Sequence, residues 1–67
     1  MNRRCLKNAM IRVAYSRDVW SGRAFRDELR DHHGVDWYDP DARSCLLELV
    51  NDGVLERTLG GTIRATK

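Results

Sequence analysis

Residues 41–66 decide the fold of this chain, and they read DARSCLLELVNDGVLERTLGGTIRAT. The first half of this stretch has the pattern of a helix with one buried side. Its apolar residues recur at helical spacing, at Ala42, Leu46, Leu49 and Val50. Gly53 follows them and supplies a C-terminal stop. We therefore predict a helix that ends just before Gly53.

After the glycine stop, the pattern changes to that of two short strands. Residues 54–55 open the first strand, and residues 62–66 are rich in β-prone side chains. Between the strands, residues 59–61 can form a tight reversal. Primed two-residue turns need a positive φ that only glycine adopts cheaply, so we expect Gly60 or Gly61 to have one. The sequence thus predicts a C-terminal β-hairpin.

Two more helices are predicted upstream. Within residues 3–16, apolar residues follow the i, i+3, i+4, i+7 pattern of one buried face, at Leu6, Ala9, Met10 and Val13. Residues 21–34 form the second predicted helix, in which Ser21 is the N-cap and Gly34 ends the helix in the left-handed conformation. Trp20, just before Ser21, is expected to pack against this helix as a hydrophobic staple.

Residues 35–40 are the predicted turn between the second and third helices. Asp39 as N-cap, followed by Pro40 as the first helical residue, makes a strong helix start. Trp37 and Tyr38 lie in this turn, and we expect Trp37 to close one end of the core. The residues predicted to form the core are Val13, Phe25, Leu29, Ala42, Leu46 and Leu49.

These elements together resemble the winged helix-turn-helix family. The resemblance rests on a helix that runs through Leu-x-x-Leu-x-x-x-Gly-Val-Leu-Glu-Arg into a hairpin, and on the helix and turn that precede it. It covers the chain from about residue 21 to the end. It implies an α+β, mostly helical fold, a three-helix winged helix-turn-helix with a C-terminal β-hairpin wing, in one domain over residues 1–67. It also implies a small DNA-binding protein of bacterial or phage type.

The composition is that of one small folded domain. The chain has 67 residues, of which 33% are charged and 42% hydrophobic, with a formal net charge of +2. No apolar run approaches the roughly 20 residues that span a bilayer. No apolar segment of a signal peptide follows the first four residues. We therefore expect a cytoplasmic protein with no membrane partner.

The sequence offers no set of residues for catalysis or for metal binding. It has no Ser-His-Asp set, no phosphate-binding glycine loop and no paired carboxylates that so small a domain could desolvate. His32 and His33 are adjacent and point about 100° apart on a helix, so they cannot share a metal ion. Cys5 and Cys45 make no disulfide framework. We expect no enzymatic activity, no cofactor, no metal and no small-molecule substrate.

The third helix supplies the first candidate contacts with a partner. At about 100° per residue, its core residues point inward and a second set points outward. The outward set is Ser44, Leu47, Glu48 and Asn51, with Arg43 on the border. Arginine, serine and asparagine donate to bases or phosphates, glutamate accepts from cytosine, and leucine offers only apolar contact.

Basic residues elsewhere complete the candidate DNA-binding surface. Three of them flank the Gly-Gly tip of the hairpin, namely Arg57, Arg64 and Lys67. Arg30 lies on an outward stripe of the second helix together with Arg23 and Arg26. Acids interleave with this stripe, so a solvated charged face is the alternative interpretation, and the role of Arg30 stays open.

Two functions fit this sequence, because the fold alone does not decide between them. The first is binding of duplex DNA through the third helix and the wing, as a transcription regulator or an architectural factor. The alternative is a protein–protein interaction module or inhibitor, in which Leu47 and neighbouring acids dock onto a basic protein. A homodimer is a further alternative partner. DNA ranks first because it is the common partner of this fold. Asp39, Asp41 and Asp52 count against it, since their charges would repel a polyanion.

Overall fold

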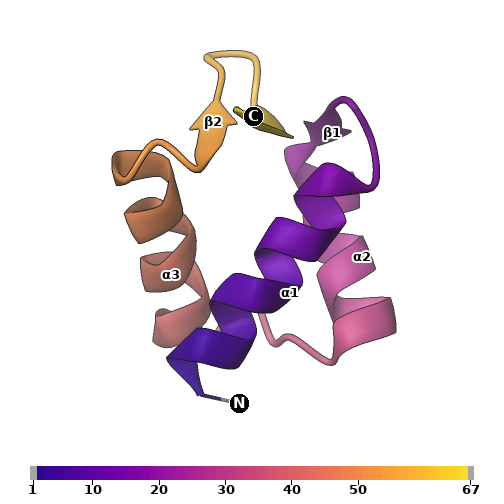
Figure 1. Cartoon of the computed structure of the whole chain (residues 1–67). Helices are drawn as coiled ribbons and strands as arrows, with labels where there is room; N and C mark the ends of the chain where they lie inside the picture. The colour runs from indigo at the N-terminus through magenta and orange to yellow at the C-terminus, as the bar shows by residue number, and fades with distance from the viewer. Residues whose placement is uncertain (1, 67) are drawn as a thin grey trace.

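A computed structural model describes residues 2–66, which form three helices and three short strands. In chain order these are α1 (Arg3–Tyr15), β1 (Trp20–Ser21), α2 (Gly22–His33), α3 (Pro40–Asn51), β2 (Leu55–Arg57) and β3 (Thr62–Ala65). Figure 1 shows α1 lying between α3 and α2, with the strands gathered at one end of the helices. The fold is α+β and mostly helical, as the sequence predicted, and is compatible with a helix-turn-helix that carries a wing.

Local signals set the ends of α2 and α3. The Ser21 hydroxyl caps α2 by accepting a hydrogen bond from the amide of Ala24 at 3.2 Å. The Asp39 carboxylate caps α3 by accepting from the amide of Asp41 at 2.9 Å, and the proline between them is the first helical residue. Gly34 ends α2 with a φ of 66°, in the left-handed region that glycine adopts most cheaply. These caps and this stop were predicted and are confirmed.

The core lies where the three helices meet the inner face of the sheet. It consists of Leu6, Ala9, Met10, Val13, Ala14, Trp20, Phe25, Leu29, Val35, Ala42, Cys45, Leu46, Leu49, Leu55 and Ile63. All six residues predicted for the core are among them. Trp20 meets the Phe25 ring edge-on, and its indole nitrogen donates to the carbonyl of Val13 at 2.8 Å. Within residues 2–66, no helix is long and apolar enough to cross a membrane.

The sheet contains one strand more than predicted. Its order is β1-β3-β2 and all pairs are antiparallel, with Trp20 opposite Ile63 and Ser21 opposite Thr62. The sequence indicated only the β2–β3 hairpin and assigned Trp20 to a hydrophobic staple. A two-residue strand carries no periodicity, and its partner lies at the other end of the chain. The junction is closed by the amide of Gly22, which donates to the carbonyl of Gly61 at 2.8 Å.

The tip of the hairpin is held by a turn followed by a left-handed glycine. The amide of Gly61 donates to the carbonyl of Thr58 at 3.0 Å, and the amide of Thr58 donates to the carbonyl of Thr62 at 3.0 Å. Gly61 has a φ of 81°, whereas Gly60 has no positive φ. The prediction of a positive φ at one of these glycines is confirmed. The predicted primed two-residue turn was wrong, because this pattern is that of a hairpin with a G1 bulge.

Candidate functional site

An open hollow of about 1090 Å³ lies between α2 and α3, bordered by the turn that joins them and by β2. Its charged lining is rich in arginine, with Arg23, Arg26, Arg30, Arg43 and Arg57 against two aspartates, Asp27 and Asp36. Aromatic and apolar side chains of the turn and of α3 complete the lining, chiefly Trp37, Tyr38, Leu46 and Leu47. We call this surface the basic hollow.

Most arginines of the basic hollow lack an acidic partner. Arg30 is the exception, because its guanidinium lies 3.1 Å from Asp31 and 3.5 Å from Asp27. The hydrogen bond to Asp31 and the charges of Asp31 and Asp27 raise the pKa of Arg30 above its ordinary value. Within residues 2–66, the other four arginines form no ion pair. Four solvated guanidiniums therefore remain available to a negatively charged partner.

The two aspartates in the lining are engaged inside the protein. Asp27 pairs with Arg30, as described, and Asp36 accepts a hydrogen bond from the amide of Tyr38 at 3.0 Å. Both acids therefore hold local structure. Their charges offset only part of the positive charge that the five arginines bring to this surface.

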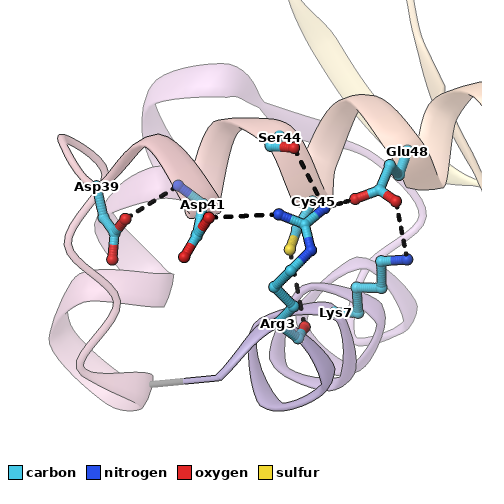
Figure 2. A network of polar contacts seen from close by, with 7 residues as sticks. All are labelled: Arg3, Lys7, Asp39, Asp41, Ser44, Cys45 and Glu48. Carbon is cyan, nitrogen blue, oxygen red and sulfur yellow. Dashed lines mark hydrogen bonds and ion pairs between the residues drawn. The ribbon is translucent and has the colours of Figure 1, made fainter.

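The acids in the body of α3 face α1 rather than the basic hollow. Arg3 lies 3.4 Å from the Asp41 carboxylate, donates to the Ser44 hydroxyl at 3.2 Å and pairs with Glu48. Lys7 lies 3.6 Å from the other oxygen of Glu48. Figure 2 shows Arg3 reaching across to these side chains of α3. We call these five residues the Arg3 cluster.

This arrangement corrects the predicted outward side of α3. The helical projection placed Ser44, Leu47, Glu48 and Asn51 on one outward side. In the structure, Ser44 and Glu48 contact α1 instead. A projection gives directions about the helix axis but does not say which neighbour lies in each direction. Arg43 and Leu47 border the basic hollow. Asn51 is exposed at the end of α3 and does not line the hollow.

The predicted arginines of the wing lie on opposite faces of the sheet. Arg57 stands opposite Ile63, and directly opposed residues of antiparallel strands share a face, so Arg57 extends the inner face toward the basic hollow. Arg64 stands opposite Glu56 on the outer face, with its Nε 3.4 Å from the carboxylate. Lys67, the third basic residue predicted there, lies outside the described residues.

Side chains that the sequence did not select also line the basic hollow. Trp37 packs against the core, as predicted, and it also borders the hollow, where the Arg26 guanidinium lies 6.0 Å from its ring centroid. Arg23 and Arg26 were recognised as a stripe with Arg30 but were not chosen as site residues. Their spacing of three and four places all three on the side of α2 that borders the hollow, and this was the signal available.

The chemistry of the basic hollow is that of anion binding. A guanidinium presents a planar fork of donors that fits phosphate or carboxylate oxygens, and the aromatic and apolar lining can contact bases or sugars. Within the described part of the chain, no three His, Cys, Asp or Glu side chains gather as a metal site. Comparisons of the chain with protein families, with curated proteins and with solved structures found no match.

Proposed function

We propose that this chain is a winged-helix protein that binds duplex DNA across the basic hollow. The observation that carries the proposal is the convergence of arginines from α2, α3 and β2 on one surface, four of them without an ion-pair partner in residues 2–66. Contacts between such cations and phosphates supply most of the affinity of sequence-independent DNA binding. Arg43 on α3 would then contact a phosphate at the edge of the major groove, and Leu47 would contact a thymine methyl group inside it.

The Arg3 cluster supports the same proposal. The carboxylates of Asp41 and Glu48 would repel DNA if they stood beside it unpaired, but Arg3 and Lys7 bind them on the α1 side. The side of α3 that borders the basic hollow carries Arg43 instead. The helix thus turns less negative charge toward a partner than its composition implies. A protein of this kind would act as a transcription regulator or an architectural factor in the cytoplasm of a bacterial cell.

An interaction module remains the second candidate, because Leu47 and Tyr38 are 51% and 84% exposed at the basic hollow. Apolar and aromatic anchors of this kind dominate the binding energy of protein interfaces. The sequence led us to expect acids beside Leu47 and hence a basic partner. Since Glu48 pairs with residues of α1 and Leu47 lines a hollow rich in arginine, a protein docked here would have to be acidic.

Salt-dependent binding of arginine variants tests the DNA proposal. We expect a labelled duplex of arbitrary sequence to bind at low salt, with a linear dependence of log K on log salt concentration. Arg26→Ala and Arg43→Ala should each lower the slope by about 0.9, the value of one lost phosphate contact on B-DNA. The matched control is Arg12→Ala, which removes the same charge from an α1 position outside the basic hollow.

Two results would overturn the proposal. One is the absence of binding to any duplex at low salt. The other is an equal change of slope in Arg12→Ala and Arg43→Ala, which would mean that net charge rather than this surface governs the binding.

A further inference from the structure

The tip of the wing presents a leucine that the fold does not use. The side chain of Leu59 is fully exposed, with a relative exposure of 110%. The relative exposure of Leu47 and of Val19 is 51%. Leu59 is the second residue of the Thr58–Gly61 turn, a position that accepts most residue types. Neither the turn nor the core therefore requires a leucine here.

Four hydrogen bonds close the loop that carries Leu59. The hydroxyls of Thr58 and Thr62 lie 2.6 Å apart across the hairpin, and the amide of Thr62 also donates to the Thr58 hydroxyl at 3.3 Å. With the two backbone bonds of the turn, these contacts fix the ends of the loop. Hydrogen bonds that restrict a loop before binding lower the entropy lost when its side chain is inserted into a partner.

The wing reaches the edge of the basic hollow through β2. Arg57, two residues before Leu59, lies on the inner face of the sheet and lines the hollow. DNA that contacts Arg57 would therefore bring its backbone, and the groove beside it, close to the wing tip. A single turn with one apolar side chain suits the minor groove, which is only about 6 Å wide.

On the basis of the proposed function, we propose that Leu59 is an apolar wedge that enters the minor groove and bends the bound duplex. Apolar side chains inserted between base steps partly unstack them and kink DNA toward the major groove. Leu59 supplies such a side chain, and Arg57 supplies a neighbouring cation for the phosphates that flank the kink. The wing then acts on the shape of DNA, and the wedge reads no base edge.

Bending can be measured separately from binding. We expect energy transfer between dyes at the two ends of a short duplex to rise when the wild-type protein binds. Leu59→Ala should still bind but leave the energy transfer near that of free DNA, and Leu59→Phe should keep the bend. The matched control is Val19→Ala, which shortens an exposed apolar side chain outside the basic hollow.

A mismatched base pair provides a second readout, because its step is already partly unstacked. We expect the wild-type protein to bind the mismatched duplex more tightly than the matched one, and Leu59→Ala to lose most of this preference. The salt slope should change by less than about 0.9 in Leu59→Ala, since no phosphate contact is removed. A role in phosphate binding would lower the slope instead.

The outcomes separate the wedge from DNA binding itself. If Leu59→Ala bends DNA and prefers the mismatch as the wild-type protein does, the wedge is wrong while the proposed function stands. If the wild-type protein binds DNA without bending it, the wedge is likewise wrong. If the wild-type protein binds no duplex at low salt, the proposed function fails and the wedge fails with it.

Discussion

Removal of Arg3 tests whether α1 shields the acids of α3 from DNA. The Arg3 guanidinium contacts Asp41, Ser44 and Glu48, and Lys7 remains 3.6 Å from Glu48 when Arg3 is gone. The side chains of these ion pairs are 31–55% exposed, so solvent screens the pairs and each contributes only about 0.2–1 kcal/mol to stability. Arg3→Ala removes two of these pairs, so we expect it to fold, with a melting temperature lowered by no more than about 16 °C.

Arg3→Ala should lower the affinity for DNA by more than the loss of one surface charge alone would. Without Arg3, the carboxylates of Asp41 and Glu48 are left on α3 with less compensation and repel the phosphates. Because Arg3 pairs with these acids and does not contact a phosphate, its loss should change the salt slope by less than the value of about 0.9 for one lost phosphate contact. Anisotropy titrations over a range of salt concentrations give both the affinity and the slope.

A double-mutant cycle with Glu48→Gln isolates the shielding. In the Glu48→Gln background, Arg3→Ala should cost less DNA affinity, because the main charge that it uncovers is absent. The control is Arg4→Ala, which removes the same charge at the next residue. Within residues 2–66, the Arg4 side chain forms no ion pair. The reasoning is refuted if Arg3→Ala lowers the slope by a full contact and its cost is the same with and without Glu48.

Three further substitutions probe the framework that positions the basic hollow. Leu49→Ala empties a fully packed site of the core and should cost roughly 2–5 kcal/mol in thermal or denaturant unfolding, and an unchanged midpoint would refute the packing of α3. Gly61→Val forces a β-branched residue to a φ of 81°, and amide hydrogen exchange should show loss of protection in β2 and β3 with the helices retained. Trp20→Phe removes the 2.8 Å hydrogen bond to the carbonyl of Val13 and should cost about 0.5–1.5 kcal/mol beyond any packing change, measured by unfolding.

The features predicted correctly from the sequence are those set by neighbouring residues. Ser21, Asp39 and Gly34 act within one helical turn of their own positions, so cap chemistry alone locates the ends of α2 and α3. The core could be predicted for a related reason, because helical spacing fixes which side chains share a face.

The features that were missed depend on partners distant in sequence. β1 exists because Trp20 and Ser21 meet a strand at the far end of the chain, and two residues show no period. Glu48 was predicted to face outward, and its pairing with Arg3 was missed because only the packing of α1 on α3 brings the two together.

That Arg57 and Arg64 lie on opposite faces of the sheet could not be predicted from neighbouring residues either. Whether Arg57 and Arg64 share a face depends on the register of the hairpin, and a turn with a G1 bulge sets a different register from a two-residue turn. A change of one residue in that register exchanges the inner and outer faces of a strand.

Mapping the surface that DNA contacts is the most direct test of the central claim. Titration of isotope-labelled protein with a short duplex at low salt should shift amide signals along the side of α2 and α3 that forms the basic hollow, and around Arg57 and Leu59. The signals of Asn8 and Arg12 on α1, which line a separate hollow, should stay in place. The claim would be contradicted by shifts centred on α1, or by the absence of any shift at saturating duplex.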